Sequence, residues 1–398
     1  MTTGGGSGAQ GAIAALWPAP ASARPAWSPF GTGTDYLAVP SPRRPRLLVP
    51  VDVPGADRLL LRHGGGRRTR AGRVAWRTAQ RSRLARWAPL PRLRVVAADD
   101  GIEAYLSQAL GRAVRIGVLL GPDRANLKPV LALYPVPSRG DSKVLGFAKV
   151  ATSAVTEPLL TAEAAALQQL ERSPVPGVVV PRLLHHGAWR GRGVLVATAL
   201  PLAQTGRRPA RIGPEVVAGI ARVGGLREQP LRQSAFWRQH SDSRLPSGWR
   251  SVDGNAWRRL VDAVPDVPCL LGSWHGDLGP WNAAQGDDHL EVWDWERFTS
   301  DVPAGMDAAH WPVQVALAAG AAASEAWPLI RRSVVDCLEA LQRNESEAAL
   351  VTAAYLVTVL DRYRHDAPET PTTALLTRVR WLLALADEVT SALHPESP

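Results

Sequence analysis

The chain has few cysteines and no long uninterrupted apolar run, and both absences exclude structural classes. Only two of its 398 residues are cysteine, Cys269 and Cys337, and they form no CxxC pair. This argues against a disulfide framework or a zinc site and favours a reducing compartment. The longest apolar stretch, residues 312–330, contains Gln314 and Glu325. These polar residues favour a buried helix over a membrane span.

The amino-terminal stretch also lacks the features of a secretory signal. "MTTGGGSGAQGAIAALWP" has no basic residue at its start, and Pro18 ends its apolar part early. We therefore expect a cytoplasmic protein, and peripheral association with a membrane stays open.

Lysine is almost absent, whereas arginine is abundant. Lys128, Lys143 and Lys149 are the three lysines, against 43 arginines. High arginine and alanine with little lysine is typical of a coding bias. A lysine retained in such a sequence is a candidate for a position that requires lysine.

The net charge of +10 belongs to one end of the chain. Residues 1–100 contain 16 Arg and 5 Asp, a balance of +11, and the remaining 30 basic and 31 acidic residues give −1. Arg58–Arg94 holds twelve arginines and no acid. The four arginines Arg70, Arg73, Arg77 and Arg81 have the spacing of one helix face. Such a segment suits an anionic membrane surface, an anionic acceptor, nucleic acid or a solvated basic face.

The residue patterns divide the chain into four parts. Residues 1–33 are rich in Gly, Ala, Ser and Pro, which predicts a flexible arm. Residues 34–98 form the basic segment, with strand-like runs. Residues 99–202 alternate as strands around one helix, and residues 203–398 are mostly helical. We expect an α+β fold with a small antiparallel β-rich lobe, a larger helical lobe and a basic amino-terminal extension.

The stretch "SWHGDLGPWN", followed by "VWDWE", carries the strongest chemical signal. Asp277 and Asn282 lie in one short loop, and "LEVWDWE" alternates as a strand that ends near Asp294. A hairpin brings Asn282 and Asp294 together as oxygen ligands of the kind Mg²⁺ prefers. Asp277 is then left to accept a proton from an attacking hydroxyl, so the set fits phosphoryl transfer.

An upstream lysine completes this set. "GFAKVA" places Lys149 in a strand of the β-rich lobe, and Glu163 follows fourteen residues later. On a helix Glu163 shares a face with Leu160, Leu167 and Leu170. A carboxylate on an apolar face requires a partner, and Lys149 is the natural one.

Lys149, Glu163, "HGDLGPWN" and "VWDWE" together resemble the aminoglycoside phosphotransferase and choline-kinase-like group, which is related to the protein kinases. The resemblance covers residues from about 100 to the carboxyl terminus. It implies a bilobal protein-kinase-like fold and an enzyme that uses ATP and Mg²⁺. The chain departs from the group at Gly279, where many members have histidine, and at Trp281, where a small residue is common.

The resemblance assigns a role to each residue of the set. Asp277 is the catalytic base, His275 supports its loop, and Asn282 and Asp294 bind Mg²⁺. Lys149 binds the ATP phosphates and Glu163 orients it. Backbone near Thr198 to Leu200 meets adenine. The amides of "GPDRAN", which begins at Gly121, are candidates for phosphate contacts.

The expected reaction transfers the γ-phosphate of ATP to a hydroxyl of a small molecule. The acceptor stays open among sugars, aminoglycosides and amino alcohols. An aminoglycoside requires an acidic pocket, a sugar requires mixed polar groups with aromatics, and a lipid-linked glycan suits the basic segment. A catalytically silent scaffold and an anionic-surface-binding protein are the alternatives. The complete set of reacting groups disfavours the silent scaffold.

Overall fold

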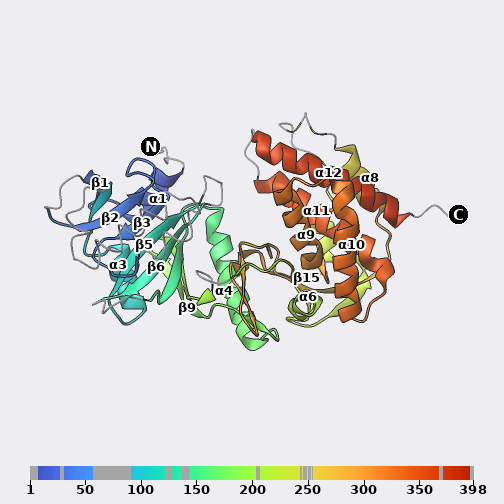
Figure 1. Cartoon of the computed structure of the whole chain (residues 1–398), viewed down its shortest axis with the longest axis horizontal. Helices are drawn as coiled ribbons and strands as arrows, with labels where there is room; N and C mark the ends of the chain where they lie inside the picture. Colours follow the sequence, from blue (N-terminus) through green and yellow to red (C-terminus); the bar gives the residue numbers. More distant parts are fainter. Residues whose placement is uncertain are drawn as a thin grey trace. The chain divides into compact units, whose positions relative to one another are not determined.

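The computed structural model describes most of the chain, in two units (Figure 1). The β unit consists of Met1–Ala164 and Pro181–Thr205, and the helical unit of Ala165–Val180 and Gly206–Pro398. The described residues are 8–26, 31–56, 91–121, 127–136, 143–202, 207–242, 244, 249, 252, 254–366 and 371–394.

An antiparallel sheet dominates the β unit. Its strands are β1 (Ser22–Ala26), β2 (Thr34–Val39), β3 (Leu47–Pro50), β4 (Arg92–Val96), β5 (Val114–Leu120), β6 (Pro129–Pro135), β7 (Gly146–Val150), β9 (Leu183–Trp189) and β10 (Arg192–Thr198). Within the described ranges these nine strands follow the order β1-β4-β2-β3-β5-β6-β7-β10-β9. Every neighbouring pair in that order is antiparallel.

The amino-terminal part of the chain is built into this sheet. Helix α1 (Ala9–Leu16) and β1 lie within the range expected as a flexible arm. In β3, Leu48 pairs with Val118 of β5, so the sheet continues from the basic segment into the β-rich lobe. Leu16 and Leu48 belong to the same buried cluster as strands β5 to β7. Their apolar side chains and those of β5 to β7 form one core, and burial in that core stabilises the amino-terminal part against the sheet.

Arg92 and Arg94 of the basic segment pair with one carboxylate of the fold. Asp35 on β2 accepts from Arg94 Nε at 2.6 Å and from Arg92 Nη1 at 3.3 Å. Arg92 is buried, and a buried charge requires such a partner. Residues 57–90, including the expected basic helix with Arg70 to Arg81, lie outside the described residues.

Two further helices accompany the sheet. Helix α3 (Ile102–Ala109) carries Glu103, which accepts from the Ile116 backbone N–H at 2.9 Å. Helix α4 (Thr156–Arg172) contains Glu163 and the three leucines that the spacing places beside it. All four of these side chains are buried, as the sequence predicts.

The helical unit contains two small sheets beside its helices. One sheet has the order β11-β12-β15 and the other β13-β14-β8. The strands are β8 (Val178–Val179), β11 (Arg227–Pro230), β12 (Pro268–Trp274), β13 (Ala283–Gln285), β14 (Leu290–Val292) and β15 (Thr299–Pro303). The helices are α6 (Pro214–Ala221), α7 (Ala235–His240), α8 (Asn255–Ala263), α9 (Met306–Ala319), α10 (Ala323–Ala340), α11 (Ala348–Asp366) and α12 (Thr373–Leu393). Within the described ranges the short 3-10 helices of this unit are η3 (Leu231–Gln233), η5 (Trp295–Arg297) and η6 (Glu345–Glu347).

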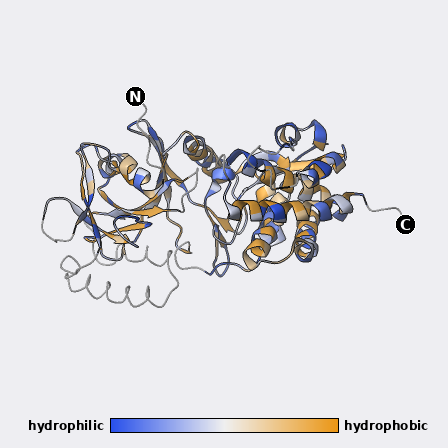
Figure 2. Ribbon diagram, turned by 90° about the horizontal axis from the view of Figure 1, so that it is seen from above, coloured by the Kyte–Doolittle hydropathy of each residue, from blue (hydrophilic) through white to orange (hydrophobic). Residues whose placement is uncertain are grey.

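The core of the helical unit forms around α11. Its residues from Ala348 to Asp361 are all buried, because the helix is apolar on every side. Hydrophobic residues, orange in Figure 2, recur along the strands of the β unit and on the helices of the helical unit. Cys269 and Cys337 are both buried, free thiols. The predicted α+β class, with an antiparallel β-rich part and a helical part, is confirmed.

Among the helices described, none has the length and apolar character that a membrane crossing requires.

Candidate active site

The "HGD" motif follows strand β12 and is held by α9. Asp307, in the first turn of α9, accepts from the backbone N–H groups of His275 at 2.7 Å and Gly276 at 3.2 Å. Gly276 has φ +80° and lies against the Arg297 carbonyl, so only glycine fits there. Arg362 Nη1 donates to the Gly276 carbonyl at 2.8 Å. The backbone before Asp277 is therefore fixed by Asp307 through its N–H groups and by Arg362 through its carbonyl.

His275 is buried and acts on the loop through hydrogen bonds. Its Nδ1 accepts from the Asp277 backbone N–H at 3.2 Å, so its Nε2 carries the proton and donates to the Trp293 carbonyl at 3.1 Å. Burial lowers the pKa of His275, which keeps the ring neutral. The ring also lies 4.4 Å from the Trp295 ring, centroid to centroid. His275 thus links the HGD loop to the DWE turn.

Asp277 has a contact on each carboxylate oxygen. Oδ2 accepts from Asn282 Nδ2 at 3.1 Å and from Trp281 Nε1 at 3.4 Å. Oδ1 lies 3.5 Å from Nε2 of the buried His310. Burial acts to raise the pKa of Asp277, but His310, with His275 and Arg362, outweighs it and lowers the pKa to about 2. The side chain stays 35% exposed, so an ionised carboxylate faces solvent.

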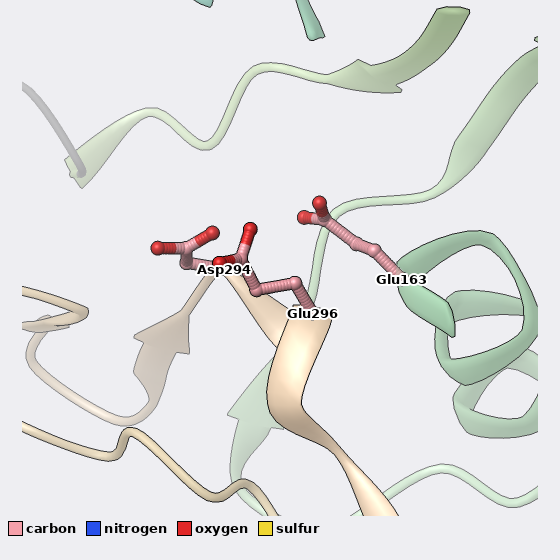
Figure 3. Close-up of side chains that lie close together, drawn as sticks. All are labelled: Glu163, Asp294 and Glu296. Carbon is pink, nitrogen blue, oxygen red and sulfur yellow. The ribbon is translucent and has the colours of Figure 1, made fainter. Parts of the chain in front are cut away.

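A hairpin brings the second motif to the first. Strands β13 and β14 pair, and the Trp293 backbone N–H donates to the Asn282 carbonyl at 3.1 Å. Asp294 follows with φ +69° and ψ +54°, a left-handed conformation that turns the chain out of the strand. The Asp294 and Glu296 side chains project from this turn and the start of η5 (Figure 3), with carboxylate oxygens within 4.8 Å of each other.

The oxygen atoms of this hairpin fit Mg²⁺. Asn282 Nδ2 donates to the Asp277 carbonyl at 2.9 Å as well as to its carboxylate, so the amide oxygen Oδ1 is the atom left to act as a ligand. An amide oxygen and the two carboxylates of Asp294 and Glu296 are the hard donors that Mg²⁺ prefers.

In the β unit, Lys149 and Glu163 form the expected pair. Lys149 Nζ, on β7, donates to Glu163 Oε1 at 2.8 Å and Oε2 at 2.6 Å. The side chains are 13% and 5% exposed. Figure 3 shows Glu163 projecting from α4. The contact holds the ammonium group of β7 against the carboxylate of α4.

The remaining predicted site residues, Gly121, Thr198 and Leu200, lie in the β unit. The Gly121 carbonyl, after β5, accepts from Arg46 Nη1, and the following residues 122–126 lie outside the described ranges. Thr198 ends β10, and its Oγ1 accepts from the Arg182 backbone N–H at 2.9 Å. Leu200 follows β10 and is buried. No contact in this structure assigns these three residues a role.

Four residues at the site are not predicted from the sequence: Glu296, Asp307, His310 and Arg362. Glu296 belongs to the "DWE" motif but received no role. Asp307 and His310 are three apart in "MDAAHW", the spacing that places two side chains on one helix face. That pattern was the available signal. It is weak by itself, because only the packing of α9 beneath the loop gives these side chains their partners.

Comparisons with known proteins give structural matches alone. No family model matches the chain, and no curated protein does. Among solved structures, the chain is similar to an aminoglycoside phosphotransferase crystallised with ADP and hygromycin B: 11% identity, TM-score 0.46, 75% of this chain and 99% of that one. A spectinomycin phosphotransferase with ADP and spectinomycin matches at 12% identity and TM-score 0.44, over 72% and 97% of the chains.

A choline/ethanolamine kinase family protein from Mesorhizobium loti matches at 15% identity and TM-score 0.37, over 66% and 92% of the chains. At such identities the ligands of these proteins do not transfer to this chain.

Proposed function

We propose that the chain is an ATP- and Mg²⁺-dependent phosphotransferase that moves the γ-phosphate of ATP to a hydroxyl of a small molecule. The observation that carries this proposal is the HGD loop. It holds one ionised carboxylate, Asp277, beside an amide whose oxygen is left for a metal, on a backbone that Asp307 fixes. Phosphoryl transfer depends on such positioning and charge stabilisation more than on covalent chemistry of the protein.

Each side chain then has one task. The Lys149 ammonium, oriented by Glu163, binds phosphate oxygens of ATP. Asn282, Asp294 and Glu296 hold Mg²⁺, which when bound neutralises phosphate charge. Adenine is assigned to the backbone between Thr198 and Leu200, and phosphate to the amides that follow Gly121.

Asp277 acts on the acceptor. Its carboxylate accepts a hydrogen bond from the acceptor hydroxyl and so orients the oxygen toward the γ-phosphorus. The new O–P bond forms while the bond from phosphorus to the ADP oxygen breaks, and the hydroxyl proton passes to Asp277. A carboxylate with a pKa of about 2 is a weak base, so its contribution is mainly orientation until the hydroxyl becomes acidic in the transition state.

The test measures ADP release from ATP and Mg²⁺ with a panel of sugars, aminoglycosides and amino alcohols, for the wild type and Asp277→Asn. We expect acceptor-dependent release that the substitution lowers by at least a hundredfold, with nucleotide binding retained. A silent scaffold would bind nucleotide, but no compound of the panel would cause ADP release. Equal release by both proteins would show that Asp277 has been assigned wrongly.

A further inference from the structure

A groove of about 430 Å³ opens in the helical unit beside the HGD loop. Trp281 lines it together with the carboxyl-terminal end of α9, the turn that follows, and the first half of α12. Its lining residues are Trp281, Gln314, Leu317, Ala318, Gly320, Ala321, Ala374, Thr377, Arg378 and Trp381. Its volume falls in the range of small-molecule sites.

Trp281 connects this groove to the reacting carboxylate. A side chain at Gly279 would meet the Trp281 ring at 2.6, 2.8 and 2.9 Å, so the indole lies where the side chain of residue 279 would otherwise stand. From there Nε1 reaches Asp277 Oδ2 at 3.4 Å. Gly279 and Trp281, the two departures from the resembled group, are therefore one coupled change. Together they give the groove an aromatic wall beside Asp277.

The polar groups of the groove are mostly donors. Arg378 Nη2 donates to Oε1 of the buried Gln314, which leaves the other guanidinium N–H groups of Arg378 as donors. Thr377 adds an exposed hydroxyl. Trp381 Nε1 donates to the Ala321 carbonyl at 2.7 Å, which fixes the second indole ring in the wall. Among the described residues that line the groove, none is acidic and Arg378 is the one cation.

This chemistry discriminates between acceptor classes. Hydroxyl, ring and carboxylate oxygens accept hydrogen bonds from such donors, and the C–H face of a sugar ring packs on an indole face. An ammonium group in the groove is repelled by Arg378 and finds no carboxylate among the described lining residues. The ionised Asp277, which accepts from Trp281 Nε1, is not one of them. Indole faces also attract quaternary ammonium, but that attraction is opposed here by the guanidinium in the same groove.

We propose that this groove is the acceptor subsite and that the acceptor is a sugar that is neutral or anionic, not an aminoglycoside or amino alcohol. The inference rests on the proposed phosphotransferase function, since it names the acceptor of that reaction. Trp281 and Trp381 supply the stacking walls, and Arg378, held by Gln314, supplies the guanidinium donors.

The first test measures binding without ATP, by saturation-transfer NMR on the full chain. The probes are glucose, maltose, glucuronate, glucosamine and choline. We expect signals from the first three, weakened tenfold or more in Trp281→Ala and in Arg378→Ala. Arg331→Ala removes an exposed arginine of α10 outside the groove and is the matched control. Tighter binding of glucosamine or choline than of glucose, or no sugar binding, would overturn the proposal.

The second test reverses the charge. Glucose and glucosamine differ by a hydroxyl and an ammonium group, so Arg378→Glu should shift the ratio of their affinities toward glucosamine by tenfold or more, about 1.4 kcal/mol. An unchanged ratio would remove Arg378 from the subsite.

The two proposals fail in different ways. If sugars bind in the groove but no acceptor supports ADP release, the phosphotransferase function fails and the binding subsite stands. If a cationic compound is phosphorylated in an Asp277-dependent reaction and sugars are not, the function stands and the acceptor class is wrong.

Discussion

The Lys149–Glu163 pair allows a test that separates stability from chemistry. Glu163 is buried, Lys149 is 13% exposed, and two hydrogen bonds of 2.6 and 2.8 Å join them. Removing one member of a buried ion pair leaves an uncompensated charge and costs about 3–5 kcal/mol. Lys149→Met and Glu163→Leu should each lower the free energy of unfolding by about that amount.

Replacing both residues should restore most of this loss. An apolar pair of similar volume is often neutral relative to a buried ion pair. We therefore expect the double variant Lys149→Met/Glu163→Leu to unfold within about 1 kcal/mol of the wild type. Its turnover should remain absent, because no ammonium is left to bind phosphate. Lys149→Arg should also be inactive, since a planar guanidinium does not replace an ammonium at a packed site.

The assay is urea denaturation followed by tryptophan fluorescence, with ADP release measured in parallel. With a slope of about 1–3 kcal/mol/M, a loss of about 3 kcal/mol moves the midpoint by about 1–3 M. Lys143→Ala, at an exposed position, is the control and should change neither measurement. Single substitutions that each cost less than about 1 kcal/mol and add up in the double variant would refute the buried pair. A double variant or Lys149→Arg with normal turnover would refute the phosphate role.

Further predictions follow from the loop and from the amino-terminal strands. Asp277→Asn should abolish turnover with Mg·ATP binding retained, whereas Asp294→Ala should weaken Mg·ATP binding; equal, small effects in calorimetry and turnover would contradict the assignment. The pKa of Asp277 is lowered to about 2, so its ionised carboxylate stabilises the fold fully above pH about 4, and this stabilisation is lost as the pH falls toward 2. Carbon-13 NMR should find the carboxylate ionised down to pH about 4. A titration midpoint above that pH would be inconsistent with these contacts. Gly279→Ala should displace the Trp281 ring and raise the acceptor KM several-fold, yet have no effect in a Trp281→Ala background; its effect on unfolding should stay below about 1 kcal/mol because the ring is 37% exposed and can move. Removal of residues 1–98 should unfold the β unit, which circular dichroism would show; a folded, nucleotide-binding remainder would mean that the amino-terminal strands are dispensable.

The basic segment remains a proposal for an anionic surface or acceptor. Arg92 and Arg94 serve the fold through Asp35, whereas the arginines from Arg58 to Arg86 lie outside the described residues. Binding of the intact chain to anionic vesicles and to duplex DNA at two salt concentrations distinguishes the membrane from nucleic acid.

Local pattern was sufficient for the elements that carry the motifs. Period-two alternation predicted β7, and the spacing of Glu163 with its neighbouring leucines predicted a buried carboxylate and therefore its lysine partner. The stretch from Asp277 to Asp294 predicted a hairpin from chain-local information. These features depend on residues close in sequence, or on a burial cost that only one partner in the chain relieves.

Tertiary packing alone decided the rest. The strand-like runs of the basic segment join the sheet because β3 pairs with β5 across more than sixty residues, and no local pattern identifies such a distant partner. Asp307 and His310 reach the loop only because α9 packs beneath it. The groove beside Trp281 exists because the first half of α12 lies next to the end of α9, although the two helices are far apart in sequence. Such contacts depend on how the whole core is buried, and no short residue spacing in the sequence predicts that.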